Sequence, residues 1–168
     1  SCNGVILLPG ETFSYNDVLG ERTADKGYQP AGAYSDGEVV EQLGGGICQV
    51  SSTLFAAVLH TDLEIITRAN HSMPVSYLPM GMDATVSWGG PEFKFKNNFA
   101  YPIKISASYS GGTITFKILG AASDKKKIEV EIKKAGEMSA ETYRKYYDEN
   151  GNVTSTKRVA RSNYKPHS

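Results

Sequence analysis

The chain has 168 residues, of which 40% are hydrophobic and 21% charged, and its formal net charge is zero. This balance is typical of a soluble globular protein, and it argues against a protein that binds nucleic acid through a basic surface. No apolar run reaches the length of a membrane span or of a signal-peptide core, so we expect no membrane span in these residues.

The first part of the chain predicts short elements and loops. The apolar run at 5–8 ends at Pro9-Gly10 and predicts a buried strand followed by a turn. Residues 11–20 predict a turn or a short helix capped by Ser14 or Asn16. Residues 20–46 are rich in glycine and polar residues and predict surface loops and short strands, which are common walls of a substrate cleft.

A cysteine directly follows three glycines at the start of a helical pattern. Apolar residues at 47, 50, 54, 57 and 58 predict a helix from about Cys48 to His60 or Thr61. Its first turn holds no acidic residue, and the positive end of a helix favours a thiolate. Taken alone, a small buried hydrophobe is the commoner role of such a cysteine, and a disulfide between Cys2 and Cys48 is a further alternative.

Short strands and turns are predicted after this helix. The β-branched run at 64–68 predicts a strand, residues 70–72 a turn, and residues 75–78 and 83–88 two more strands separated by a turn at 79–82. His71 and Asp83 would then lie at strand edges downstream of the cysteine. This order predicts a helix packed on an antiparallel sheet.

The rest of the chain alternates between apolar and polar residues. Strands are predicted at 93–96, 101–109 and 113–119, the last two forming a hairpin around Gly111-Gly112. Further strands are predicted at 127–133, 141–147 and 153–160, with a turn at 149–151 and a frayed tail at 162–168. We therefore expect an α+β protein whose C-terminal third is nearly all strand.

The candidate chemistry is that of a cysteine nucleophile. Such a site needs a thiolate, a base, a group that orients the base, and donors for the developing oxyanion. Cys48 would be the nucleophile, His71 the base and Asp83 the orienting group. The backbone N–H of Cys48 would be one oxyanion donor, and the remaining oxyanion and substrate contacts are assigned to Gln42, Gly45, Gly46 and Gln49.

Each of these residues also has a simpler interpretation. His60 is expected to cap the end of the helix, His71 fits a plain turn, and Asp83 fits a turn cap. Cys48, His71 and Asp83 with a water would also make a zinc site, but the spacing lacks a close ligand pair. We therefore predict no metal and no cofactor.

Several long motifs resemble the VanW family of bacterial proteins. The resemblance covers about residues 3–120 and, more loosely, Tyr164-Lys165-Pro166; it is carried by residues 8–14, residues 44–54, His71-Ser72, residues 77–79 and residues 81–86. It implies a protein on the extracellular face of a Gram-positive cell envelope, linked to vancomycin resistance and contacting a cell-wall peptide or peptidoglycan. Because the chain starts at Ser1, we expect a piece of a longer surface protein, which leaves room for a membrane anchor elsewhere.

The order of the candidate residues is also similar to the core of transglutaminase-like and papain-like enzymes. The similar features are a helix headed by Cys48, a strand ending at Arg68, and His71 followed by Asp83-Ala84-Thr85. Two residues depart from that pattern, namely Gln49 after the cysteine and Met73 two residues after the histidine. The similarity implies a transglutaminase-like core at 1–120, with a cysteine-bearing helix on an antiparallel sheet, and a β-rich extension at 121–168.

These observations leave an enzyme and a binding module open. The first hypothesis is a Cys-His-Asp thiol enzyme that hydrolyses or transfers amide-linked acyl groups of cell-wall peptides. The alternative is a non-catalytic cell-wall binding module, in which residues 44–48 shape a groove and the β-rich extension provides the binding face.

Overall fold

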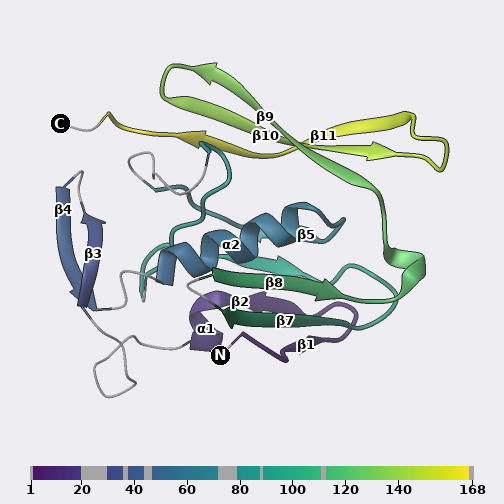
Figure 1. The fold of residues 1–168 in the computed structure, drawn as a ribbon, viewed down its shortest axis with the longest axis horizontal. Coiled ribbons are helices and arrows are strands. Elements are labelled where there is room, and N and C mark those ends of the chain that lie inside the picture. The colour runs from purple at the N-terminus through teal and green to yellow at the C-terminus, as the bar shows by residue number, and fades with distance from the viewer. Residues whose placement is uncertain are drawn as a thin grey trace.

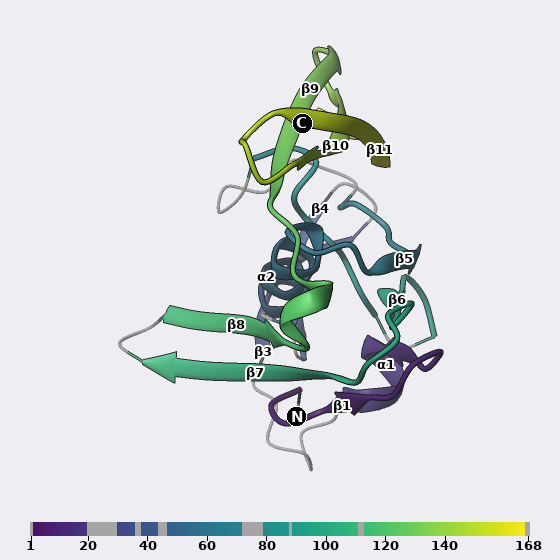
Figure 2. The same ribbon diagram turned by 90° about the vertical axis from the view of Figure 1, so that its right-hand side faces the viewer.

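A computed structural model describes residues 2–19, 30–35, 38–43, 47–71, 79–87, 89–110 and 113–166 of the chain. Helix α2 (Ile47–Leu59) runs through its middle. Figure 1 shows the C-terminal strands on one side of this helix and strands β1 (Ile6–Leu7), β7 (Ile103–Ser110) and β8 (Thr113–Leu119) on the other, and the turned view in Figure 2 shows the same layering. The helix is therefore covered from two sides.

The described strands all pair in antiparallel fashion and form four small sheets. The first has the order β1-β7-β8, from β1 (Ile6–Leu7), β7 (Ile103–Ser110) and β8 (Thr113–Leu119). The second has the order β2-β6-β5, from β2 (Thr12–Ser14), β6 (Lys94–Lys96) and β5 (Glu64–Thr67). The C-terminal sheet has the order β11-β10-β9, from β9 (Ile128–Gly136), β10 (Ser139–Tyr147) and β11 (Val153–Asn163). A separate hairpin joins β3 (Pro30–Ser35) and β4 (Glu38–Leu43).

The remaining regular elements are short. Helix α1 (Tyr15–Leu19) follows β2 directly, and a 3₁₀ turn (Ala122–Asp124) leads into the C-terminal sheet. Ser14 caps α1, because its Oγ accepts the backbone N–H of Asp17 at 3.2 Å, as the sequence predicted. Among the described residues, no helix has the length and hydropathy needed to cross a membrane.

Strand β1 differs from its prediction. The sequence predicted a buried strand at 5–8, but the strand covers only Ile6–Leu7, and Ile6 is 57% exposed while Leu7 is buried. The reason is its place at the sheet edge, where it pairs with β7 alone. The helix expected from residue 48 and the strands expected at 64–68, 93–96, 101–109, 113–119, 127–133, 141–147 and 153–160 are confirmed, with ends shifted by a few residues.

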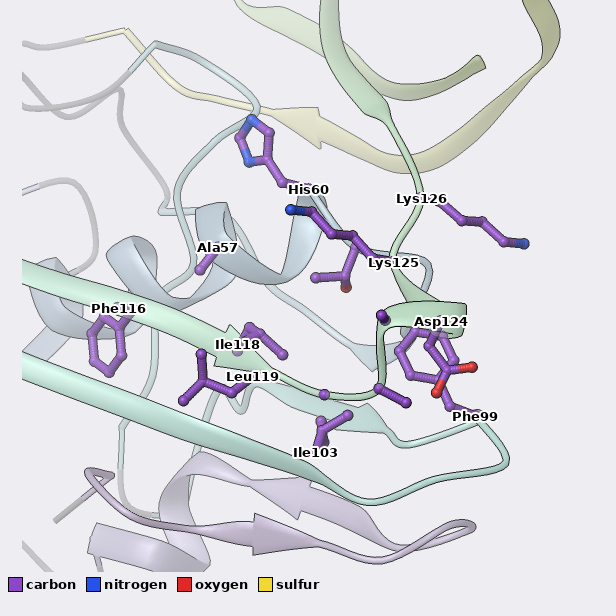
Figure 3. A pocket seen from close by; sticks show the side chains of 14 residues that line it. Ala57, His60, Phe99, Ile103, Phe116, Ile118, Leu119, Asp124, Lys125 and Lys126 are labelled. Atoms are coloured by element: carbon purple, nitrogen blue, oxygen red, sulfur yellow. The ribbon is translucent and has the colours of Figure 1, made fainter. Parts of the chain in front are cut away.

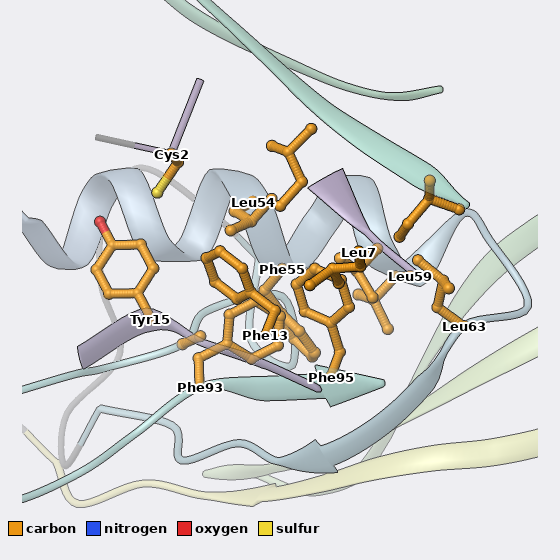
Figure 4. Packing of buried hydrophobic residues seen from close by; sticks show 14 of the residues in the cluster. Cys2, Leu7, Phe13, Tyr15, Leu54, Phe55, Leu59, Leu63, Phe93 and Phe95 are labelled. Atoms are coloured by element: carbon orange, nitrogen blue, oxygen red, sulfur yellow. The ribbon is translucent and has the colours of Figure 1, made fainter. Parts of the chain in front are cut away.

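Aromatic rings from β2, α2 and the strand region around β6 form the core. Phe13 stacks on Phe95 with ring centroids 4.9 Å apart, and Phe55 meets Phe93 edge to face at 5.5 Å. Figure 4 shows these rings gathered against one face of α2, beside Leu54 and Leu59. Each such side chain, when fully buried, stabilises the fold by about 1.5–3 kcal/mol. This core therefore fixes α2 on the N-terminal strands.

Cys2 belongs to this core and not to a disulfide. Its thiol is free and buried, and burial raises its pKa. A buried thiol with a raised pKa is a poor nucleophile. The alternative of a bridge from Cys2 to Cys48 is thus not what the structure holds.

The C-terminal sheet is attached to α2 by a buried arginine. Alternate residues of β10 are buried, and among them Arg144 is only 3% exposed. Its Nε, Nη1 and Nη2 donate to the carbonyls of Leu59, Leu63 and Val58 at 2.9, 2.9 and 2.8 Å. These carbonyls belong to the end of α2 and the turn after it, where a helix leaves acceptors without intrahelical partners. Arg144 therefore caps the helix from another sheet.

The predicted α+β fold with a transglutaminase-like core is wrong. The described chain is mainly small antiparallel sheets, and the strand after α2, β5, pairs with β6, which in turn pairs with β2. Residues 83–87 form no strand, although one was predicted at 83–88, and His71 also lies outside any strand. The strand predicted at 75–78 lies outside the described residues. The division into domains at residue 120 stays a prediction.

Side-chain bonds explain why residues 83–87 form no strand. Asp83 accepts the backbone N–H of His71 on its carboxylate at 2.7 Å, and the N–H of Thr85 donates to the carbonyl of Ala69 at 2.8 Å. Residues 83–87 are therefore attached to residues 69–71 partly through the Asp83 side chain. Paired β-strands would be joined by backbone hydrogen bonds alone. Aspartate favours such local bonds over regular pairing.

Candidate functional site

A histidine and an aspartate are hydrogen-bonded to each other in the interior. Nδ1 of His71 lies 2.7 Å from Oδ2 of Asp83, and the same oxygen accepts the backbone N–H of His71 at 2.7 Å. His71 is 7% exposed and Asp83 1%. His71 follows β5 by four residues and Asp83 lies in the irregular segment 79–87, so two loops supply the pair. The two residue types that the sequence singled out are thus in direct contact.

Two further side chains, Tyr164 and Arg68, contact Asp83. Tyr164 donates its hydroxyl to Oδ1 of Asp83 at 2.5 Å, and Nη2 of Arg68 lies 3.5 Å from the same oxygen. Arg68 also donates through Nε to the Asp83 carbonyl at 2.8 Å and through Nη1 to Oγ of Ser162 at 2.6 Å. Its guanidinium lies over the ring of Phe55, 4.9 Å from the centroid. Asp83 is therefore held by donors on both carboxylate oxygens.

These donors keep Asp83 ionised despite its burial. Burial alone would raise the pKa of the Asp83 carboxyl. The hydrogen bonds from the ring and backbone of His71, the hydroxyl of Tyr164 and the charge of Arg68 oppose it, and the pKa lies below its usual value. An ionised carboxylate only accepts, so Nδ1 of His71 must carry the proton that lies between them. We assign this tautomer from the hydrogen bonds.

Two serines of α2 connect the helix to the same loop. Oγ of Ser51 donates to the carbonyl of Ala84 at 2.7 Å, and Oγ of Ser52 to the same carbonyl at 3.1 Å. The N–H of Ala84 donates back to Oγ of Ser52 at 2.9 Å. Both serines are fully buried. The helix is therefore bonded to the residue next to Asp83, one turn beyond the position of Cys48.

The other predicted site residues fall outside what the structure describes. Cys48 and Gln49 lie in the first turn of α2 and Gln42 lies in β4, but their side chains are outside the described part of the chain. Gly45 and Gly46 lie outside the described residues altogether. His60, expected to cap the helix, does so: its Nδ1 lies 2.8 Å from the carbonyl oxygen of Ala56.

Tyr164 and Ser162 are the site residues that sequence reasoning missed. Residues 162–168 were predicted to fray, but 162 and 163 belong to β11, Ser162 is fully buried and Tyr164 is 7% exposed. The prediction failed because this stretch lacks a periodic apolar pattern, and its burial comes from polar partners far away in the chain. The loose resemblance of Tyr164-Lys165-Pro166 to the VanW family was the one signal that pointed to it.

A metal cluster and an open cavity are two other kinds of site that the described residues could offer. Among the described residues, no group of three or more His, Cys, Asp and Glu side chains could hold a metal ion. A cavity of about 560 Å³ lies at the other end of α2, between Ala57, Ile103, Phe116 and the loop around Asp124 (Figure 3). Neither His71 nor Asp83 lines it. Its walls are mainly apolar, so the buried cluster around His71 and Asp83 is the better candidate for a catalytic site.

A protein family and two known proteins match a large part of the chain. The family described as "VanW like protein" matches residues 1–119. YoaR of Bacillus subtilis, described as an uncharacterized protein, is 52% identical over 109 residues, which make up 65% of this chain and 36% of YoaR. The vancomycin B-type resistance protein VanW of Enterococcus faecalis is 37% identical over 101 residues, 57% of this chain and 37% of that protein.

The chain thus spans little more than a third of the length of these two relatives. No solved structure matches the chain. His71 and Asp83 lie within the matched residues, whereas Ser162 and Tyr164 lie beyond them. Because the family match covers well over half of its residues, the chain belongs to the VanW-like protein family.

Proposed function

We propose that this chain is a thiol-dependent enzyme of the bacterial cell envelope that hydrolyses or transfers an amide-linked acyl group of cell-wall peptides. The observation that carries the proposal is the 2.7 Å hydrogen bond between Nδ1 of His71 and Oδ2 of the buried Asp83. A carboxylate bound at Nδ1 orients an imidazole so that Nε2 exchanges protons with a nucleophile and a leaving group.

The helix position of Cys48 supports its role as that nucleophile. Residues three and four apart share one face of a helix, so position 48 lies on the face of Ser51 and Ser52. That face is bonded to Ala84, the neighbour of Asp83. The first turn of α2 also carries no acidic residue, and a helix N-terminus favours a thiolate.

The proposed reaction has two steps. The thiolate of Cys48 forms a C–S bond with the carbonyl carbon of an amide, the C–N bond breaks, and the amine leaves with a proton from the His71 imidazolium. Water or a second amine then forms the new bond to the acyl carbon, His71 takes the proton of that nucleophile, and the C–S bond breaks to return the thiolate. Asp83 stays ionised throughout and orients the ring.

The substrate contacts and the cellular setting are parts of the same proposal. The oxyanion would accept from the backbone N–H of Cys48 and the side-chain amide of Gln42, with Gly45, Gly46 and Gln49 beside the substrate. The name of the Enterococcus relative links that protein to vancomycin resistance, and we extend this link to the present chain. The substrate would then be peptidoglycan or its peptide, on the extracellular face of a Gram-positive envelope.

Alkylation of Cys48 by iodoacetamide at pH 6 tests the proposal. The chain has two cysteines, so a Cys2→Ala background leaves Cys48 as the only thiol. A free peptide cysteine, with a pKa of about 8.5, is roughly 0.3% thiolate at pH 6. An activated thiolate gains from its population and loses some intrinsic nucleophilicity, so we expect alkylation about tenfold faster than that of the peptide.

A pair of histidine variants separates the site from a general effect on the fold. His71→Gln should remove the rate advantage, whereas His60→Gln should keep it, because His60 contacts the carbonyl of Ala56 and not Asp83. A wild-type rate equal to that of the peptide would overturn the catalytic proposal. Sedimentation of such a protein with purified peptidoglycan would then support the non-catalytic binding module.

A further inference from the structure

The last described residues of the chain bring a hydroxyl group to the buried carboxylate. We propose that Tyr164 is a positioning residue of the His71–Asp83 pair: its hydroxyl fixes the Asp83 carboxylate, which in turn holds His71 with the proton on Nδ1. The inference rests on the proposed function for its catalytic meaning. It assigns a role to a residue beyond the 119 that match the family.

The direction of the Tyr164 hydrogen bond is set by a backbone group. The N–H of Gly81 lies 2.8 Å from the tyrosine oxygen, and an N–H can only donate, so the hydroxyl accepts there. The single hydroxyl proton then remains for Oδ1 of Asp83 at 2.5 Å. The Tyr164 hydroxyl therefore accepts from Gly81 and donates to the Asp83 carboxylate.

The two carboxylate oxygens have divided tasks. Oδ2 accepts both the ring and the backbone N–H of His71, whereas Oδ1 faces Tyr164 and the longer 3.5 Å contact with Arg68. The terminal torsion of an aspartate is broad and does not by itself hold the carboxylate plane. Without the hydroxyl, the long contact with Arg68 is the one that the described residues still make with Oδ1, and the carboxylate plane turns more easily away from Nδ1 of His71.

The chain segment that carries Tyr164 is itself fixed on two sides. The backbone N–H of Tyr164 donates to the carbonyl of Met138, in the turn between β9 and β10, at 2.8 Å. Nδ2 of Asn70 donates to the carbonyl of Asn163 at 2.8 Å, and Arg68 donates to Ser162. Residues 162–164 therefore bond to the segment that carries His71 as well as to their own sheet, which is the rigidity a positioning residue needs.

The expected consequence concerns the tautomer of His71. A base in the proposed reaction must accept a proton on Nε2, which requires the neutral ring to carry its proton on Nδ1. A carboxylate that turns away from Nδ1 releases this constraint and admits the other tautomer. The loss should be smaller than that from Asp83→Asn, because Arg68 and the backbone of His71 still contact Asp83.

Tyr164→Phe tests the inference, with Tyr146→Phe as the matched control. Tyr146 lies in the same sheet and also donates its hydroxyl to a carboxylate, Oδ1 of Asp62 at 2.7 Å, away from His71. Both variants keep the aromatic ring and lose one hydroxyl. The readouts are the ¹⁵N shifts of the two His71 ring nitrogens in the full chain, which report the tautomer, and the alkylation rate of Cys48.

We expect Tyr164→Phe to move the His71 nitrogen shifts toward the Nε2-protonated tautomer and to slow alkylation about threefold, which is part of the tenfold advantage, with Tyr146→Phe changing neither. Unchanged nitrogen shifts in Tyr164→Phe, or equal changes in both variants, would overturn the inference. The two proposals fail separately. A wild-type thiol that is not activated defeats the proposed function, while a tautomer change confined to Tyr164→Phe still supports the positioning role.

Discussion

Two contacts between the C-terminal region and the rest of the protein differ in kind. The helix contact joins Arg144 to the carbonyls of Val58, Leu59 and Leu63, whereas the site contact joins Thr142 and Tyr164 to Gly81 and Asp83. Thr142 and Arg144 are next but one on β10 and point the same way. One face of one strand thus serves both contacts.

The difference between the two contacts lies in the groups that accept. Every acceptor in the helix contact is a backbone carbonyl, which does not titrate and has no chemistry of its own. The site contact ends on an ionised carboxylate that is already bonded to an imidazole. The helix contact should therefore affect stability alone, while the site contact should affect both stability and the reactivity that we propose.

The largest expected effect comes from breaking the helix contact with Arg144→Leu. Three carbonyls would lose a buried, charged donor, and such losses are costly because the acceptors stay out of water. We expect the free energy of unfolding in urea to fall by about 3–5 kcal/mol. The unfolding free energy of Arg144→Lys should lie between those of wild type and Arg144→Leu, since an ammonium group does not reproduce the planar fork of a guanidinium. A loss below about 1 kcal/mol would show that the contact is dispensable.

Gly81 lies in the site contact, and Gly151 offers a matched control away from it, so an alanine substitution at each tests that contact. Gly81 and Gly151 both have positive φ, +92° and +83°, so alanine is disfavoured at each. A Cβ on Gly81 would lie 2.8 Å from Oγ1 of Thr142 and 3.3 Å from Cδ1 of Ile132, whereas one on Gly151 would meet nothing within 4 Å.

We therefore expect Gly81→Ala to cost about 2–4 kcal/mol of unfolding free energy and Gly151→Ala about 1 kcal/mol. Only Gly81→Ala should also slow alkylation of Cys48, because Gly81 donates to Tyr164. Equal costs for the two substitutions would mean that the loop at Gly81 yields without disturbing the sheet.

Acid should separate the two contacts further. The pKa of Asp83 is held below its usual value in the folded protein, against its burial. The unfolded chain has the usual value of about 3.9, so the contribution of Asp83 to stability is complete above that pH and is lost as pH falls through the folded pKa. The stability difference between wild type and Asp83→Asn should therefore be larger at pH 7 than at pH 3. The difference for Arg144→Leu should change much less, because carbonyls do not titrate.

The local patterns explain which elements could be predicted. Helix α2 and the β7–β8 hairpin follow from the spacing of apolar residues and from Gly111-Gly112, which are features of neighbouring residues. His71 and Asp83 were singled out by residue type and order, and they are only twelve positions apart in the sequence. Both results depend on short-range information.

The missed features depend on long-range polar contacts. Tyr164 and Asp83 are 81 residues apart, and Arg68 and Ser162 are 94 apart. The sequence Ser162-Asn163-Tyr164 alone does not indicate that these residues contact a buried carboxylate and a buried guanidinium, those of Asp83 and Arg68. The transglutaminase-like fold was inferred from the order of three residue types, and that order does not determine how strands pair.

The smallest expected effect compares two donors at the same helix end. His60 lies at the exposed end of α2 with Nδ1 2.8 Å from the carbonyl oxygen of Ala56, while the buried Arg144 serves the carbonyls just beyond. Water replaces the imidazole donor in His60→Ala, so we expect a loss of about 0.5 kcal/mol in the urea unfolding free energy. If His60→Ala lowered the unfolding free energy as much as Arg144→Leu does, any capping donor would matter equally for the stability of this helix end. A small loss for His60→Ala would show that the stability of this helix end depends on the buried donor Arg144. That donor comes from the C-terminal sheet, whose last strand leads directly into Tyr164.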